Sequence, residues 1–180
     1  MSKIEIRPLN ASPQIRAMLS EILIEVVANG GSVSFMHPLA QADAEAFWDG
    51  SLAAADRGER VVLGAWDGET LAGTVTLLLA FPPNQPHRAE IAKMMTRMSH
   101  RGRGIASALM QEAERRAVEL GRTLLVLDTA SEEGASGLYE KLGFVFAGEV
   151  PDFALKPHGG LTGTKFYWKR IGAPAASPQP

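Results

Sequence analysis

The stretch that most constrains the fold is a glycine-containing turn between a predicted strand and a predicted helix. The strand covers residues 88–98, the turn is Arg101-Gly102-Arg103-Gly104, and an apolar stripe marks the helix over residues 105–120 before Gly121 ends it. A short, nearly all-apolar strand follows at residues 124–128, as expected for a strand buried on both faces. Because a helix joins these two strands, they must run parallel in the sheet.

The flanking segments predict a layered domain of the α+β (α/β layered) class. Their alternating and helical apolar patterns are bounded by turns that contain glycine or proline. Further strands are expected at residues 4–9, 60–66, 71–81, 144–150 and 164–170, and further helices at about residues 13–28, 40–57 and 135–142. This order predicts a mixed sheet with helices on its faces.

Length and composition exclude several kinds of protein. The 180 residues suit one domain, which we expect over residues 1–171, with a flexible tail at residues 172–180. Cysteine is absent, which excludes disulfides, thiolate metal sites and a covalent thioester on the enzyme. The four histidines lack the spacing of metal ligands, so no metal is expected.

Charge and hydropathy indicate the surroundings in which the chain works. A formal net charge of −2 gives no sign of a nucleic-acid partner. No apolar run approaches the ~18 residues that a membrane span needs. Residues 1–7 carry charges where a signal peptide would need its apolar stretch, so we expect a cytoplasmic protein. Whether it is a monomer or a homodimer stays open.

The turn at residues 101–104 is predicted to bind an anion. A helix N-terminus has unpaired N–H groups and a partial positive charge. Gly102 and Gly104 let the backbone approach an anion closely, while Arg101 and Arg103 add donors and charge. The physical interpretation is a pyrophosphate-binding turn, and the plain alternative is a strand-to-helix turn with solvated arginines.

Three phosphate-containing ligands compete for this turn. A P-loop requires Gly-Lys-Ser/Thr, and no lysine follows Gly104. A dinucleotide fold requires a third glycine, where Ser107 stands, and an acidic residue about 20 positions further on, which Asp128 could supply. That fingerprint belongs to a βαβ series, whereas a hairpin-rich half precedes the turn here. A dinucleotide-binding oxidoreductase therefore stays a minor alternative, and coenzyme A is the third candidate.

Two motifs resemble those of the GNAT superfamily of N-acetyltransferases. Residues 101–106, Arg-Gly-Arg-Gly-Ile-Ala, resemble its acyl-CoA loop, and residues 138–144, Leu-Tyr-Glu-Lys-Leu-Gly-Phe, resemble its second signature. The resemblance covers roughly residues 60–170, and the order of the elements matches throughout. Ser99 stands where the family's loop often begins with Gln or Arg, which removes one polar contact but leaves the backbone cradle.

The resemblance implies a fold and an acetyl-CoA site. The implied sheet is mixed and mostly antiparallel, with about seven strands, helices on both faces and an acyl-CoA cleft between two splayed, parallel central strands. Main-chain groups of Met94 and Thr96 are implied to pair with the pantetheine arm as an added strand would. The cofactor-binding residues expected on this basis are Met94, Met95, Thr96, Arg101, Gly102, Arg103, Gly104, Ile105 and Ala106.

Three side chains are expected to carry the chemistry. In the resembled family the tyrosine of the second motif points its hydroxyl at the thioester sulfur, so Tyr139 is the expected acid; the plain alternative is a core tyrosine. Glu90 and Asp128 are candidate bases or holders of the acceptor's ammonium group, because strand ends border the crevice of open α/β sheets. Their plain alternatives are a solvated glutamate and a loop-capping aspartate, and the base is not assigned to one of the two. Strand alternation puts Glu90 on one face with Ala92, Met94, Thr96 and Met98.

The sequence thus predicts an acyl-CoA-dependent N-acetyltransferase that moves an acetyl group directly to a primary amine of a small molecule in a ternary complex. A narrower resemblance, to the tabtoxin-resistance acetyltransferase branch, rests on residues 88–94, 127–129 and 148–169. The acceptor is expected to be an amino-acid-like metabolite or an antibiotic, with antibiotic resistance as a candidate role. Residues 152–156 and the two N-terminal helices are expected to shape its pocket. A non-catalytic acyl-CoA sensor is the rival hypothesis.

Overall fold

The computed structural model describes residues 3–132 and 134–172. All but the first residue of the expected tail at 172–180 therefore lies outside the described residues. The elements are β1 (Ile4–Pro8), α1 (Pro13–Ala28), α2 (Gln41–Asp56), β2 (Arg60–Asp67), β3 (Thr70–Leu78), β4 (Arg88–Thr96), a 3₁₀ turn (Met98–His100), α3 (Ile105–Glu119), β5 (Leu124–Ala130), α4 (Ser136–Lys141), β6 (Val145–Leu155) and β7 (Leu161–Arg170).

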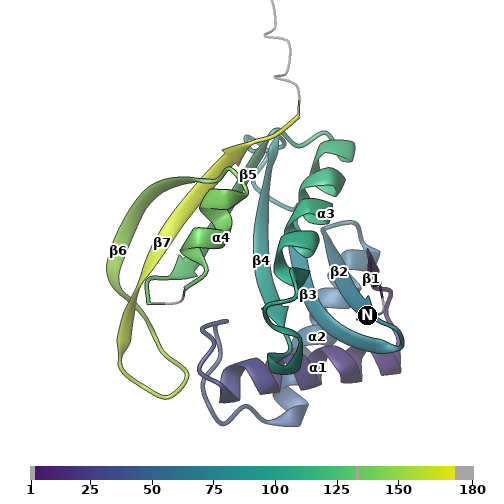
Figure 1. The fold of residues 1–180 in the computed structure, drawn as a ribbon. Helices are drawn as coiled ribbons and strands as arrows, with labels where there is room; N and C mark the ends of the chain where they lie inside the picture. Colours follow the sequence, from purple (N-terminus) through teal and green to yellow (C-terminus); the bar gives the residue numbers. More distant parts are fainter. Residues whose placement is uncertain (1–2, 133, 173–180) are drawn as a thin grey trace, which may run out of the picture.

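A single seven-stranded sheet organises these elements, in the order β1-β2-β3-β4-β5-β7-β6. Every neighbouring pair is antiparallel except β4 and β5, which α3 joins and which run parallel. Figure 1 shows α3 and α4 in front of the sheet, with α1 crossing near the start of α3. The expected mixed, mostly antiparallel α+β sheet is confirmed.

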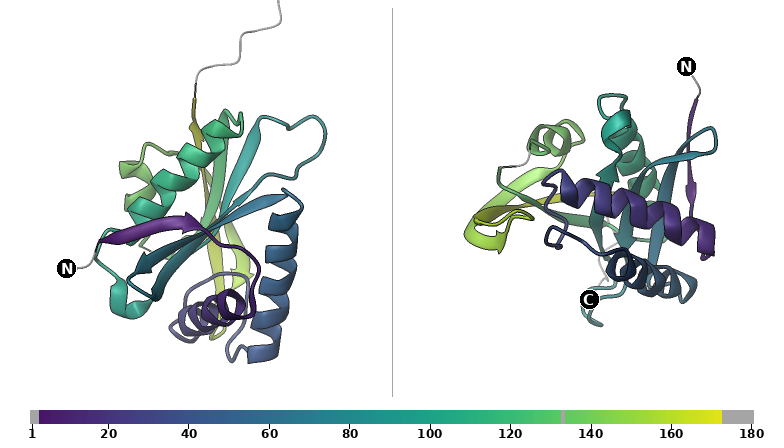
Figure 2. Two further views of the ribbon diagram at one scale, coloured as in Figure 1. Left: turned by 90° about the vertical axis from the view of Figure 1, so that its right-hand side faces the viewer. Right: turned by 90° about the horizontal axis from the view of Figure 1, so that it is seen from below.

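Two apolar cores hold the helices to the two faces of the sheet. The view from below in Figure 2 shows α3 and α4 on one side of the sheet and α1 and α2 on the other. Leu109 and Ala113 of α3 pack on one face, where the side chains of Ala89 and Ile91 also point. The other face carries α1 and α2, and its core includes the following buried residues: Leu19, Ile22, Leu23, Trp48, Leu52, Val62, Leu71 and Met95. Because both faces are covered there, β2 and β3 are buried on both sides along most of their length.

A bulge in β4 separates it from β5. Thr76 pairs with Ala92 and Thr74 with Met95, so Lys93 and Met94 together oppose one residue of β3. Lys93 adopts φ 50°, in the left-handed region. An extra residue of this kind bends a strand and increases its twist. We attribute the divergence of β4 from β5 to this bend.

The bulge corrects one expectation about β4. Strict alternation predicted that Glu90, Ala92, Met94 and Thr96 share a face, as far as Met98. In the structure Met94 packs against the α3-side core and Met95 belongs to the core under α1 and α2. The extra residue reverses the alternation beyond Ala92, and Met98 lies outside β4 altogether.

The C-terminal hairpin is longer than its apolar pattern predicted. The two strands expected at residues 144–150 and 164–170 extend to Val145–Leu155 and Leu161–Arg170. Pro151 and the positive φ of Asp152, 52°, interrupt the alternation, and the pairing register shifts between Val150 and Ala154. The chain nevertheless continues as a strand beyond this irregularity. None of the described helices is both long and apolar enough to cross a membrane.

Candidate active site

Pairing between β4 and β5 ends early. Three rungs join the strands, and the last is Glu90 opposite Val126. No further rung joins β4 to β5 within the described ranges, although both strands continue. The edge of β4 that faces β5 beyond Glu90 therefore offers main-chain donors and acceptors without a strand partner. Two adjoining cavities lie beside this separation.

The first, which we call the large cavity, has a volume of about 580 Å³. This volume falls within the range of roughly 300–1,000 Å³ that is usual for small-molecule and cofactor sites. Met94, Met95 and Thr96 of β4 form one wall, and the turn before α3 forms another. The hydroxyl oxygen of Thr96, a residue of this wall, is buried and has no hydrogen-bond partner among the described residues.

The glycine turn takes its shape from backbone conformations that other residues rarely adopt. Gly102 has φ 74° and Gly104 has φ 75°, and Gly104 is the N-cap of α3. Gly102, Gly104, Ile105 and Ala106 line the large cavity, where the N–H groups of the first helical turn have no intrahelical acceptor. The turn therefore brings main-chain donors to the wall of the cavity.

The two arginines of the turn are placed differently. Arg101 lines the large cavity and makes no ion pair with any residue in the described ranges. Arg103 is not part of the lining, and its Nη1 donates to Asp67 Oδ2 over 2.8 Å. His100 Nε2 lies 3.4 Å from the same carboxylate oxygen, so Asp67 ties the turn to the end of β2. That the Arg103 side chain binds the ligand directly stays a prediction. Its hydrogen bond to Asp67 does not favour this role, because the guanidinium is already held by that carboxylate.

The second, which we call the small cavity, has a volume of about 140 Å³. It adjoins the large cavity, because Val33, Met94 and Ala135 line both. Its remaining lining residues come from four separate segments and include Ser32, Ser34, Ile91, Ala92, Lys93, Leu127, Asp128, Thr129 and Tyr139. A small molecule held here would lie next to the contents of the large cavity.

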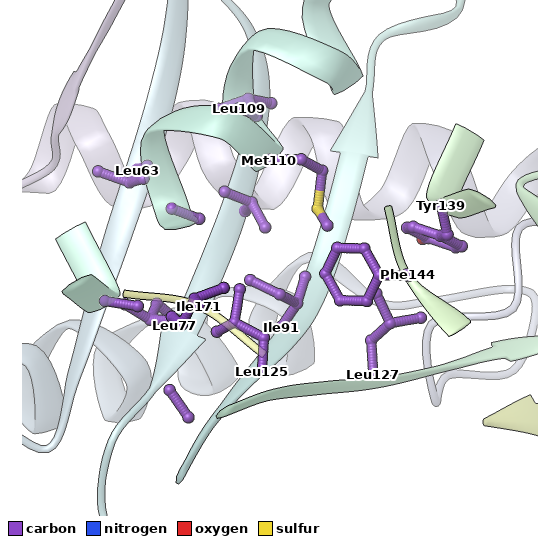
Figure 3. Close-up of a cluster of buried hydrophobic side chains, with 14 of the residues drawn as sticks. Leu63, Leu77, Ile91, Leu109, Met110, Leu125, Leu127, Tyr139, Phe144 and Ile171 are labelled. Atoms are coloured by element: carbon purple, nitrogen blue, oxygen red, sulfur yellow. The ribbon is translucent and has the colours of Figure 1, made fainter. Parts of the chain in front are cut away.

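Tyr139 reaches the small cavity from α4 and is also part of the core. Its side chain is buried, and its ring centroid lies 6.1 Å from that of Phe144 and 5.9 Å from that of Tyr167. Figure 3 shows Tyr139 with Phe144 and Leu127 at one end of the buried cluster. The two interpretations of Tyr139, a catalytic acid and a packed core residue, are thus compatible, because this core tyrosine also borders a cavity.

Asp128 and Lys93 are two charged side chains of the small cavity, and the pKa values of both are shifted. Burial among protein atoms raises the pKa of Asp128 from its ordinary value, although the Lys93 charge opposes this rise. Burial lowers the pKa of Lys93, while the charge of Asp128 acts in the opposite direction and Arg60 lowers this pKa further. The cavity therefore makes both charged forms less stable than in water.

Glu90 lies on the same face of the sheet as Asp128 but lines neither cavity. The face follows from alternation, since Ile91 and Leu127 point into the α3-side core and their neighbours point away from it. The Glu90 carboxylate accepts a hydrogen bond from Arg88 Nη1 over 3.1 Å. Of the two predicted carboxylates, Asp128 lines the same cavity as Tyr139, whereas Glu90 is paired with Arg88.

Sequence reasoning missed Lys93 and the segment from Ser32 to Ser34. Lys93 was unremarkable because alternation placed it on the other face from Glu90, and nothing in the sequence indicates the bulge. Ser32 and Ser34 follow the glycines that end α1 and reach the site through tertiary packing. Residues 152–156, which were expected to help shape the acceptor pocket, line neither cavity. No group of three or more His, Cys, Asp or Glu side chains in the described ranges is arranged to hold a metal ion.

Comparison with solved structures supports the same architecture. An N-acetyltransferase from Staphylococcus aureus Mu50 superposes with a TM-score of 0.80 at 22% identity, over 95% of this chain and 100% of that one. The Salmonella typhimurium protein yncA, solved with its cofactor acetyl-CoA, gives 0.78 at 19% identity, over 96% of both chains. At these identities the likeness concerns the fold.

Sequence comparison gives the family. YsnE of Bacillus subtilis (strain 168), an uncharacterized N-acetyltransferase, is 33% identical over 97 residues, which span 52% of this chain and 62% of that protein. The pattern of the acetyltransferase (GNAT) family matches residues 28–144, which include β4, the glycine turn, α3 and Tyr139. Because this match covers more than half of the chain, the protein belongs to the acetyltransferase (GNAT) family.

Proposed function

We propose that this protein is an N-acetyltransferase that transfers an acetyl group from acetyl-CoA to the primary amine of a small molecule. The observation that carries the proposal is the junction of the two cavities at Val33, Met94 and Ala135. One cavity suits a phosphate-bearing cofactor and the other holds a carboxylate and a tyrosine. Amino-acid-like metabolites and antibiotics remain the candidate acceptors, and the cytoplasm the candidate location.

Acetyl-CoA fits the large cavity by the chemistry of its walls. The N–H groups at the start of α3 and the Arg101 guanidinium would bind the pyrophosphate, because a helix N-terminus and an unpaired cation both favour an anion. The free edge of β4 near Met94 and Thr96 would pair with an extended, amide-containing arm. When bound, acetyl-CoA supplies an acetyl group activated as a thioester.

The small cavity supplies what an amine needs to react. An acceptor amine is protonated in water and must lose a proton before its lone pair can form a bond to the acetyl carbon. Asp128 would hold the ammonium and accept this proton, directly or through water, and its raised pKa makes the carboxylate a stronger base. Confinement beside the large cavity would hold the amine close to the acetyl group.

Tyr139 is the proposed donor to the leaving thiolate. Its hydroxyl-bearing ring is fixed by contacts with Phe144 and Tyr167, so its position costs little ordering during the reaction. A phenol has an ordinary pKa of ~10 and stays protonated near neutrality, which suits a donor. Donor main-chain groups on the free edge of β4 are proposed to stabilise negative charge on the carbonyl oxygen.

An acetyl-CoA-dependent screen of primary amines, read as release of free thiol, tests this function. Amino acids, polyamines and aminoglycosides cover the acceptor classes that a small, charged cavity could admit. We expect saturable thiol release with at least one class, and mass spectrometry should show an acetylated amine. Binding of acetyl-CoA without acetylation across this panel would support the sensor hypothesis instead. A thermal-shift comparison of acetyl-CoA with NAD would separate both from a dinucleotide-binding protein.

A further inference from the structure

The side chain of Lys93 is an unassigned feature of the small cavity. Its Nζ donates to Ser34 Oγ over 3.1 Å and lies 6.0 Å and 5.7 Å from the ring centroids of Phe35 and Phe47. The φ of 50° at this bulge residue lies in the left-handed region, and strained backbone of this kind clusters at binding sites. The chain thus holds an ammonium group beside the proposed position of the acceptor.

The charges around Lys93 are unbalanced. The two groups that act electrostatically on Lys93 are one carboxylate, Asp128, and one further cation, Arg60. Arg60 Nη1 donates to Ser51 over 3.2 Å, while its Nε is buried without a hydrogen-bond partner among the described residues. The carboxylate of Glu90, on the same face of the sheet, is already bound to Arg88. Asp128 is therefore the carboxylate that opposes the Lys93 charge, whereas Arg60, whose charge also acts on Glu59, adds to the positive charge that Lys93 meets.

This imbalance bears on which amines can bind. An acceptor whose only charged group is an ammonium would gain the attraction of Asp128 but would also meet the Lys93 ammonium in the same cavity. Like charges at short distance in a partly dry site destabilise binding. An acceptor that also carries an anion would neutralise Lys93 and restore the balance.

We propose that the acceptor carries a carboxylate or similar anion close to its amine, with the amine at Asp128 and the anion at Lys93 and Ser34. Ser34 already contacts Lys93 Nζ, so its hydroxyl and the ammonium form one donor pair. The volume of about 140 Å³ limits this part of the acceptor to a few non-hydrogen atoms, which suits the amine-and-anion end of an amino acid. The proposal rests on the function proposed above and narrows its acceptor class to zwitterions.

A structural role for Lys93 makes a different prediction. If Lys93 only fastens Ser34 to β4, replacing it should loosen this wall and weaken all acceptors alike. If Lys93 binds the anion, replacing it should weaken only acceptors that carry one. Matched ligands with the same side chain separate these roles: an α-amino acid, its carboxamide, and the amine that lacks the carboxyl group.

The experiment compares wild type, Lys93→Met, Lys93→Arg and the control Lys3→Met, which removes an exposed lysine ahead of β1. Initial rates of thiol release give KM and kcat for each ligand of a set, and calorimetric titration into the CoA-saturated protein gives binding without turnover. We expect wild type to bind the acid at least about tenfold more tightly than its carboxamide, as for a hydrogen bond between charged groups. Lys93→Met should abolish this preference, whereas Lys93→Arg and Lys3→Met should keep it.

Each result decides one of the two proposals. A preference for the carboxamide or the bare amine, an equal effect of Lys93→Met on all three ligands, or the absence of both turnover and acid-selective binding would overturn the anion site. Acid-selective binding that depends on Lys93, without any acetylation, would keep the anion site and overturn the acetyltransferase function. Acetylation without any dependence of the acid preference on Lys93 would keep the acetyltransferase function and overturn the anion site.

Discussion

The large and the small cavity adjoin, yet they are built from different parts of the chain. The proposed acetyl-CoA cavity depends on backbone: a strand edge, two glycines with positive φ and the start of a helix. The proposed acceptor cavity depends on side chains from separate segments, among them Ser34, Lys93, Asp128 and Tyr139. A backbone site keeps its shape when most side chains change, whereas a side-chain site can change its ligand with one substitution.

This difference predicts how mutations divide. Changes in the small cavity should alter turnover and acceptor choice while leaving acetyl-CoA affinity intact. Changes in the backbone of the glycine turn should do the reverse. Substitutions at single residues of each cavity, paired with matched controls, test this division.

Asp128→Asn should lower kcat/KM for the acceptor by about 100-fold or more, because removal of a general base typically costs 10²–10⁴-fold. Steady-state thiol release measures this loss, and calorimetry should show acetyl-CoA affinity within about twofold of wild type. Glu90→Gln is the matched variant, and its loss should be at least about tenfold smaller because Glu90 lines neither cavity. Equal losses in the two variants would move the base to Glu90 or to both.

Tyr139→Phe should lower kcat at least about tenfold, since the hydroxyl is the proposed donor to the thiolate and the ring keeps its core contacts. Tyr167→Phe is the control, because Tyr167 is also buried and its ring packs against that of Tyr139. Rapid-quench or steady-state rates should show the loss in the first variant alone. An unchanged rate in Tyr139→Phe would remove this residue from the chemistry.

Gly104→Ala should raise the KM for acetyl-CoA by about tenfold, because a Cβ disfavours the φ of 75° that shapes the turn by ~1–2 kcal/mol. Gly58→Ala imposes the same strain at φ 75° after α2, and at both glycines an added Cβ would meet no atom within 4 Å. Thermal melts should show similar destabilisation, while only Gly104→Ala weakens acetyl-CoA. Parallel losses of affinity would attribute the effect to stability rather than to the turn.

The pH profile should separate the cavities too. Asp128 acts as a base only when ionised, so kcat/KM for the acceptor should fall as the pH is lowered through its pKa. Because this pKa is raised, the fall should occur at a higher pH than an ordinary aspartate would give. Asp128→Asn should remove this acidic limb from its residual rate. Acetyl-CoA affinity over the same pH range should not show the limb. A limb that persists in the variant would belong to another group.

The smallest effect concerns Glu112 in the middle of α3, a residue that lines neither cavity. Arg115 and Arg116 hold the pKa of Glu112 at about 2, below its ordinary value of 4.5. A depressed pKa adds stability above pH 4.5 that is lost as pH falls toward 2, so Glu112→Gln should destabilise the fold at neutral pH and converge with wild type in acid. Denaturant titrations should show that the variant loses less than about 1 kcal/mol of unfolding free energy at neutral pH, because Arg115 is exposed and solvent screens the ion pair. Activity should not change.

The same contrast explains how much the sequence could predict. The glycine turn is one contiguous segment, and its two glycines indicate positive φ angles directly. Its place before α3 was therefore predictable. The parallel β4 and β5 followed from the helix between them. Lys93 was not predictable, because one extra residue in β4 reverses alternation and leaves no mark in the apolar pattern. Ser34 comes from a loop whose position depends on tertiary packing.

Hydrogen exchange on addition of acetyl-CoA tests the central claim most directly, because it reads the main-chain amides that are proposed to bind the cofactor. We predict saturable protection, at concentrations below about 1 mM, of amides in residues 91–96 and 102–107, with little change in the β6–β7 hairpin. Absence of saturable binding at millimolar acetyl-CoA, or protection that avoids both segments, would contradict the account.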